Sequence, residues 1–235
     1  MKSTIKILFF WLAALATITP VLQGIYAQEL FIVKNQKKYQ EEISKDSIHQ
    51  MIEVKSSIPT IVYDLRYSTN NNFTKERLYK DGSKTFLRKP VVQALADVQK
   101  ELNSIGYGLK LFDAYRPYKV TQKIWNLVGD VRFAADPKKG SNHNRGLAVD
   151  LTIIDLKTGN ELDMGTGFDS FSDTAHTSFT QLPKKSLRNR FLLKEVMIKH
   201  GFHIFETEWW HFFWENDRDY SVLDLSFKEL EKLTD

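Results

Sequence analysis

SNHNRGLAVDLTII, residues 141–154, contains the strand around which the rest of the chain can be organised. Residues 147–154 are apolar at nearly every position, and a strand that is apolar on both faces lies buried within a sheet. Asp150 interrupts this run, and a buried carboxylate is costly unless it pairs with a cation or binds a metal. His143, on a segment that Gly146 allows to bend, favours the metal. A salt bridge to a buried arginine is the alternative.

A second histidine lies far downstream in the segment EWWHFFW, residues 208–214. A lone histidine in an aromatic strand is usually a core residue, but here Glu208 stands three positions before His211. Residues at this spacing face opposite sides of a regular strand, so both can serve one site only if the backbone turns or bulges near Trp209. Two imidazoles and a carboxylate can form a catalytic zinc site with an open position, and Glu208 is the candidate base. The pattern predicts metal-assisted hydrolysis.

Arg116 ends a further apolar strand, residues 109–115, and is followed by Pro117. Proline restricts the preceding residue to extended conformations, so the guanidinium projects from a rigid element. One interpretation is a fixed cation that faces the metal and stabilises an oxyanion. The other is a structural ion pair with Asp113.

The periodicity of the chain predicts an α+β fold, with helices packed on a mainly antiparallel sheet. Apolar residues three and four apart predict a helix that Pro90 opens and Gly106 ends. Glycine, proline and short polar residues predict a long ordered loop over residues 163–183. The same rules give strands over 58–67, 109–115, 147–154, 202–205 and 210–214, and helices over 118–128 and 187–200.

The chain is expected to divide into three parts. Lysines followed by an apolar run and a small residue at Ala27 predict a cleaved secretory signal peptide over residues 1–27, with an uncleaved membrane anchor as the alternative. The polar residues 28–57 predict a linker or a peripheral segment, and residues 58–235 one catalytic domain. The protein is therefore expected to be exported to the periplasm, with no stable membrane insertion after cleavage.

The composition excludes several classes of protein and site. A hydrophobic content of 42% predicts a packed globule rather than a disordered chain. The chain has no cysteine, which excludes disulfides and limits zinc ligands to histidine, aspartate and glutamate. Its net charge of +4 comes without a dense basic stripe, so nothing supports nucleic acid as a partner. The oligomeric state is not predicted.

Several blocks of the sequence share one family pattern: 64–69, 72–74, 106–108, 113–117, 141–150, 164–169 and 208–211. Together they resemble the D-alanyl-D-alanine dipeptidases of the vancomycin-resistance type, which belong with the zinc D-Ala-D-Ala metallopeptidases and the hedgehog-like fold. The resemblance covers about residues 58–225. The Ser-x-His-x6-Asp pattern is shared by that wider superfamily, whereas the blocks around Tyr67, Asp169 and Glu208 are specific to the dipeptidases.

The resemblance implies a metal site and its catalytic groups. One zinc ion per chain would be bound by His143, Asp150 and His211. Glu208 would act as the catalytic acid and base, taking a proton from the attacking water and returning one to the leaving amine. Arg116 would hold the developing oxyanion. The implied activity is zinc-dependent hydrolysis of D-Ala-D-Ala.

The resemblance also implies a pocket for a small D-amino-acid dipeptide, lined by Ser141, Tyr67 and Asp169. The Asp169 carboxylate suits a free ammonium group, which would select dipeptides over longer chains. The best-known members of the family are cytoplasmic, so the expected signal peptide departs from their pattern.

Three other functions fit parts of the same pattern. A periplasmic D,D- or L,D-carboxypeptidase would use the same residues to trim peptidoglycan stem peptides. A wall-binding or hedgehog-like module would keep zinc without turnover, although Glu208 and Arg116 speak for an enzyme. An iron oxygenase with two histidines and one carboxylate is disfavoured by the neighbouring glutamate and by the lack of a cofactor motif.

Overall fold

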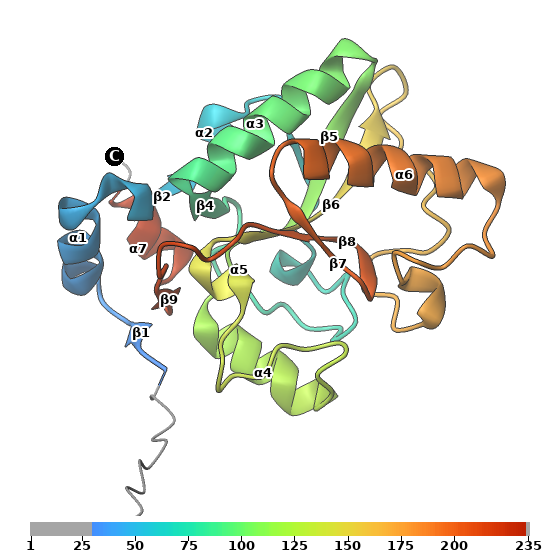
Figure 1. Ribbon diagram of the computed structural model, residues 1–235. Coiled ribbons are helices and arrows are strands. Elements are labelled where there is room, and N and C mark those ends of the chain that lie inside the picture. Colours follow the sequence, from blue (N-terminus) through green and yellow to red (C-terminus); the bar gives the residue numbers. More distant parts are fainter. Residues whose placement is uncertain (1–29, 234–235) are drawn as a thin grey trace, which may run out of the picture.

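The computed structural model describes residues 30–233, so the expected signal peptide, residues 1–27, lies outside the described residues. The described chain folds around a five-stranded sheet of order β3-β5-β6-β8-β7 (Figure 1). Strands β3 and β5 run parallel, and the other neighbours run antiparallel. This confirms the predicted α+β fold with a mainly antiparallel sheet. The strands are β3 Val62–Tyr63, β5 Tyr107–Asp113, β6 Ala148–Asp155, β8 Glu208–Phe213 and β7 His203–Phe205.

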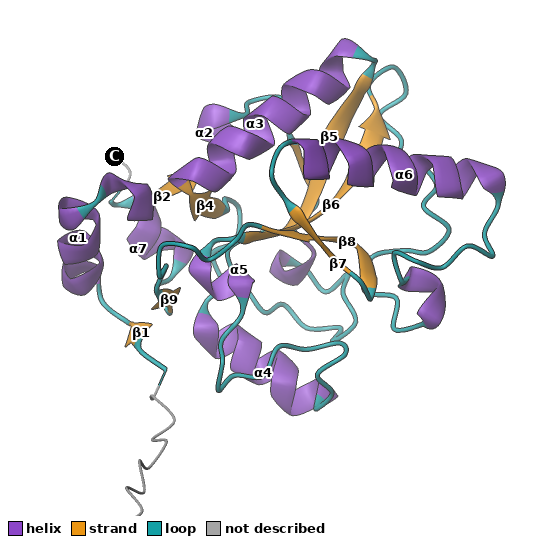
Figure 2. Ribbon diagram, viewed as in Figure 1, coloured by secondary structure: helices purple, strands orange, loops and turns teal. Residues whose placement is uncertain are grey.

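Strand β6 is buried along nearly its whole length, as its apolar sequence predicted. Val149, Leu151 and Ile153 belong to the core cluster that includes helices α3 and α6. Because side chains alternate along a strand, Asp150 points to the opposite face of the sheet. Helices α3 and α6 lie on one side of the sheet, and α4 and α5 lie on the other (Figure 2). These helices are α3 Lys89–Ser104, α6 Lys184–Lys199, α4 Tyr118–Val128 and α5 Asn142–Arg145.

The predicted boundaries of α3 are confirmed to within a few residues. Pro90 lies in the first turn, where its missing N–H costs no helical hydrogen bond. The chain leaves the helix through Gly106, whose φ of +86° favours glycine. The apolar stripe that predicted the helix, Val91, Leu95, Val98 and Leu102, is fully buried.

Two local predictions were wrong. The strand expected over residues 58–67 shrinks to β3, because Pro59 and Thr60 form a turn before it and a 3-10 turn, Arg66–Ser68, follows it. Proline lacks the backbone N–H that hydrogen bonding between strands needs, so strand pairing begins only after Pro59. The segment that carries His143 was expected to be a bent loop, but it forms the single helical turn α5.

The segment 30–57, for which the sequence left a linker and a peripheral segment open, is folded onto the domain. Strand β1 (Ile32–Val33) pairs with β9 (Val222–Leu223), and Val33 and Met51 are fully buried. The peripheral elements are α1 Gln36–Lys45, β2 Met51–Glu53, α2 Val54–Ser57, β4 Phe86–Arg88 and α7 Phe227–Glu231.

None of the helices within residues 30–233 combines the length and the apolar character needed to cross a membrane.

Candidate metal centre

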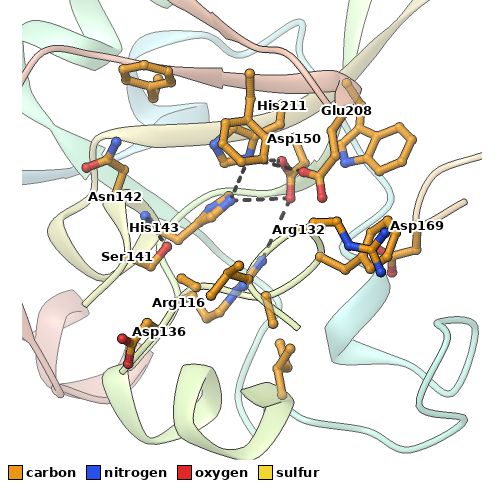
Figure 3. Close-up of a pocket in the computed structure, with 18 of the residues that line it drawn as sticks. Arg116, Arg132, Asp136, Ser141, Asn142, His143, Asp150, Asp169, Glu208 and His211 are labelled. Carbon is orange, nitrogen blue, oxygen red and sulfur yellow. Dashed lines mark hydrogen bonds and ion pairs between the residues drawn. The ribbon is translucent and has the colours of Figure 1, made fainter. Parts of the chain in front are cut away.

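Three side chains from three different elements meet on the face of the sheet that α5 covers (Figure 3). Asp150 of β6 lies opposite His211 of β8 in the ladder, and His143 reaches them from α5. His211 Nδ1 lies 2.9 Å from Asp150 Oδ1 and 3.2 Å from His143 Nε2. His143 Nε2 lies 3.4 Å from Asp150 Oδ2. The structure thus brings the three expected ligands together.

The orientation of His143 is set by the capped turn α5. Ser141 Oγ accepts a hydrogen bond from the backbone N–H of His143, and Asn144 Oδ1 accepts one from the N–H of Ser141, which is a capping box. Gly146 ends the turn with a φ of +69°, where a Cβ would be strained. His143 Nδ1 lies 2.7 Å from the carbonyl oxygen of Ala114, to which it can donate. That bond leaves the Nε2 lone pair facing the other two ligands.

Strand β8 is irregular between Glu208 and His211. Its ladder with β7 skips residues 209–211 of β8, so the strand bulges there. The bulge brings Glu208 Oε2 to 3.9 Å from His211 Nδ1. The turn or bulge predicted near Trp209, which a shared site requires, is confirmed.

The donor atoms of this cluster fit a zinc ion. Imidazole nitrogen and carboxylate oxygen are ordinary zinc ligands, and a set of three leaves a position open for water or substrate. Burial alone would raise the pKa of Asp150, but the adjacent His143 and His211 hold that pKa below its ordinary value, so the carboxylate is ionised. The facing nitrogens of the two imidazoles attract each other only if one is protonated, whereas a cation between them binds both lone pairs.

Glu208 lies beside this cluster in a buried position. Burial raises the pKa of its carboxyl to about 7; His211 opposes this rise and Asp150 adds to it. A carboxyl group with a pKa near neutrality can take up and release a proton at physiological pH. Its position and its protonation behaviour therefore match those of a catalytic acid and base.

Arg116 forms the expected ion pair with Asp113 and also lies beside the metal cluster. Its Nε and Nη2 donate to Asp113 Oδ2 over 3.0 and 2.8 Å, and Nη2 lies 3.8 Å from Asp150 Oδ2. The guanidinium also stacks over the ring of Tyr67, 5.1 Å from its centroid. The backbone N–H of Arg116 donates to the carbonyl of His143. The ion pair with Asp113 therefore fixes a cation beside the metal cluster instead of withdrawing it.

A cavity of about 370 Å³ opens over the cluster, and every residue that the sequence assigned to the site lines it. The hydroxyl of Tyr67 lies 3.1 and 3.2 Å from the two carboxylate oxygens of Asp169. Asp169 adopts a φ of +58°, which is uncommon for a residue with a side chain. Burial raises the pKa of Asp169 well above its ordinary value, and the nearby Asp150 adds to this rise. A cationic group in the cavity would relieve that cost.

Two supporting residues escaped the interpretation of the sequence. Asn144 Nδ2 donates to the backbone carbonyl of Arg116 over 2.8 Å, and Tyr79 donates to Asp113 Oδ1 over the same distance. The spacing of Ser141 and Asn144 is that of a capping box, which could have identified Asn144. Tyr79 leaves no local signal, because its partner lies 34 positions away.

A family model described as D-ala-D-ala dipeptidase, Peptidase_M15, matches residues 47–229. The chain belongs to this family. M15 membership confirms the expected metallopeptidase class. M15 peptidases are zinc enzymes, and the histidine–aspartate–histidine cluster is suited to that ion.

Two curated relatives carry the same description as the family model. A D-alanyl-D-alanine dipeptidase of Escherichia coli (strain K12) is 34% identical over 163 residues, which are 69% of this chain and 83% of that protein. One of Enterococcus faecalis is 30% identical over 177 residues, covering 64% of this chain and 84% of that protein. A zinc-bound structure of the vancomycin-resistance D,D-pentapeptidase VanY aligns with a TM-score of 0.36 and 17% identity, over 57% of this chain and 75% of that chain.

Proposed function

We propose that this M15 peptidase is a dipeptidase that hydrolyses D-alanyl-D-alanine with one zinc ion per chain. The observation that carries the proposal is that His143, Asp150 and His211 share one cavity with Glu208 and Arg116. A carboxyl group and a guanidinium beside a metal site supply the proton transfer and the positive charge that peptide hydrolysis needs. The two relatives named D-alanyl-D-alanine dipeptidase support this substrate.

The proton transfers fall to Glu208. When bound by the three ligands, zinc would supply a Lewis acid that polarises the substrate carbonyl and acidifies a water molecule. Glu208 accepts the proton of the attacking water at its carboxylate and delivers it to the nitrogen of the leaving D-alanine. A pKa near 7 makes both protonation states accessible during the cycle.

Arg116 stabilises the negative charge of the transition state. As the carbonyl carbon becomes tetrahedral, its oxygen gains negative charge, and a fixed cation stabilises that charge more than it stabilises the ground state. Asp113 and the ring of Tyr67 hold the guanidinium before substrate arrives, so it need not reorganise during the reaction.

Groups on two opposite sides of the cavity would bind the two ends of the dipeptide. Asp169, held by the Tyr67 hydroxyl, is suited to the ammonium group of the first D-alanine. Ser141 lies on the other side of the metal cluster (Figure 3). Its oxygen accepts from the N–H of His143, which leaves the hydroxyl hydrogen to donate to the substrate.

The setting of the enzyme is also part of the proposal. Residues 1–27 would act as a signal peptide that directs the chain to the periplasm. Its substrate there would be the free dipeptide D-Ala-D-Ala. Residues 58–235 would form the catalytic domain, and residues 28–57 a peripheral segment. The partner is a small molecule and not nucleic acid.

A comparison of two substrates tests the proposal. The purified, zinc-loaded chain should hydrolyse the free dipeptide D-Ala-D-Ala far faster than it removes D-alanine from a stem pentapeptide ending in D-Ala-D-Ala. The reverse preference would identify the protein as a carboxypeptidase. No hydrolysis of either substrate by zinc-loaded protein would favour a binding module.

A further inference from the structure

Three phenylalanine rings from three different loops close one side of the cavity. Phe171 lies between the other two: its ring centroid is 5.0 Å from that of Phe73 and 5.1 Å from that of Phe133, both in edge-to-face contact. All three rings line the cavity. The three loops therefore meet there in one apolar surface, called here the aromatic wall.

The aromatic wall adjoins Tyr67, which is hydrogen-bonded to the Asp169 carboxylate. Phe171 follows Asp169 by two residues on the same loop. Tyr67, whose hydroxyl lies 3.1 Å from Asp169 Oδ1, also contacts the ring of Phe73 edge to face, with centroids 6.3 Å apart. A substrate ammonium at Asp169 would thus have the rings of the wall as its next neighbours.

The opposite side of the cavity has a different chemistry. Its lining there is polar and includes Ser141, Asn142 and Asp136. Figure 3 shows these three on one side of the metal cluster and Asp169 on the other. The cavity is therefore asymmetric. Aromatic rings lie at the proposed amino end of the substrate, where the Arg132 guanidinium lies 5.1 Å from the centroid of the Phe133 ring, and hydroxyl, amide and carboxyl groups lie at the other end.

This asymmetry bears on the length of the substrate. A peptide extended at its amino end replaces the ammonium by an amide, which forfeits the charge pairing with Asp169. Its additional residue must also occupy the volume of the wall. Phenyl rings offer no partner to a peptide N–H or C=O, and the Arg132 guanidinium beside Phe133 can only donate. The N–H of the additional peptide bond would therefore stay unpaired against the wall, which is costly.

We propose that Phe73, Phe133 and Phe171 determine the substrate length by excluding peptides that extend beyond the residue whose amino group meets Asp169. The inference rests on the proposed dipeptidase function and deepens it. Phe171 is the ring on which the exclusion depends most. It contacts both of the other rings, and 42% of its surface is exposed to solvent. Because this ring is already partly exposed, its truncation would open the amino end of the cavity to solvent.

Truncation of this ring gives the direct test. We compare kcat/KM of the wild-type enzyme and of Phe171→Ala for D-Ala-D-Ala and for the tripeptide L-Lys-D-Ala-D-Ala, each zinc-loaded. The ratio of tripeptide to dipeptide activity should rise by about tenfold or more, the range that one altered pocket contact provides. An unchanged ratio in a variant that still cleaves the dipeptide would overturn the inference, as would a wild-type enzyme that cleaves both peptides equally well.

A matched control and a second readout keep the result specific. Phe191 of α6 is 64% exposed and lies outside the lining of the cavity, so Phe191→Ala should leave the ratio unchanged. Binding of both peptides is also measured by calorimetry in a Glu208→Gln background. There, Phe171→Ala should increase the affinity for the tripeptide and leave the affinity for the dipeptide unchanged. Equal effects on both peptides would contradict a wall.

The remaining outcomes are also decisive. If Phe171→Ala does not fold, Phe133→Ala removes a neighbouring ring of the wall from another loop, and the same shift in the ratio is expected. If the wild-type enzyme cleaves neither peptide, the proposed function fails. If it cleaves the dipeptide and neither variant shifts the ratio, the wall inference alone fails.

Discussion

The hydroxyl of Tyr79 donates a hydrogen bond to Oδ1 of Asp113 over 2.8 Å, while Arg116 takes the other oxygen, Oδ2. The Asp113 carboxylate is fully buried, and its two oxygens have different partners, a phenol and a guanidinium. Tyr79 does not line the cavity. Its ring also packs edge to face against that of Tyr67, so only the effect of its hydroxyl must pass through Asp113 to Arg116.

Tyr79→Phe should lower kcat more than it raises KM. Without this hydrogen bond the Arg116 guanidinium is displaced or more mobile, and it then stabilises the transition state less well. We expect a loss of about 5- to 20-fold in kcat/KM and about 1–2 kcal/mol in the free energy of unfolding. Tyr63→Phe is the matched control, since Tyr63 also donates to a carboxylate, Glu53, away from the cavity. Equal kinetic losses in both variants would show a general effect of destabilisation.

Glu208→Gln separates metal binding from proton transfer. The side chain keeps its size, and the three proposed ligands are untouched, so the zinc content measured by atomic absorption should match that of the wild-type protein. The kcat should fall by about 10²–10⁴-fold, the range that general acid–base catalysis contributes. A rate near that of the wild-type enzyme would remove Glu208 from the mechanism.

Asp169→Asn removes the charge proposed to meet the substrate ammonium while keeping the shape of the side chain. The kcat/KM for D-Ala-D-Ala should fall by about 100-fold, because a buried ammonium would lose its counter-charge. The loss should be much smaller for N-acetyl-D-Ala-D-Ala, which has no ammonium. Equal losses for the two substrates, measured side by side, would argue against this role.

The pH dependence of kcat/KM should show an acidic limb that reports Glu208. A base must be ionised to accept a proton, so activity rises as the pH rises through its pKa and is lost below it. Burial raises that pKa to about 7 in the metal-free chain, and a zinc cation nearby favours the carboxylate and lowers it. We expect a limb at or below pH 7 in the zinc enzyme. A limb at clearly alkaline pH would contradict the assignment.

The sequence predicted those parts of the fold that depend on local periodicity. Strand β6 and helix α3 follow from runs and stripes of apolar residues, and their burial leaves little choice of conformation. The strand expected over residues 58–67 failed because Pro59 acts against the apolar pattern around it. Turn chemistry outweighed hydrophobicity at that point.

The candidate site divides in the same way. Asp150 and His211 stand out because each interrupts an apolar or aromatic run, and Glu208 stands out because its spacing from His211 requires a bulge. Tyr79 and the aromatic wall did not stand out, since tyrosine and phenylalanine are ordinary core residues whose roles arise from contacts between distant loops. Such contacts become visible only in three dimensions.

Metal-titrated hydrolysis of D-Ala-D-Ala tests the central claim most directly. The chelated, metal-free protein is titrated with zinc while D-alanine release is measured, and L-Ala-L-Ala serves as the control peptide. We predict no activity without metal, full activity at one zinc per chain, no cleavage of the L,L peptide, and loss of the response in His143→Ala. Hydrolysis of D-Ala-D-Ala that persists in the metal-free protein, or its absence from the fully loaded protein, would contradict the account.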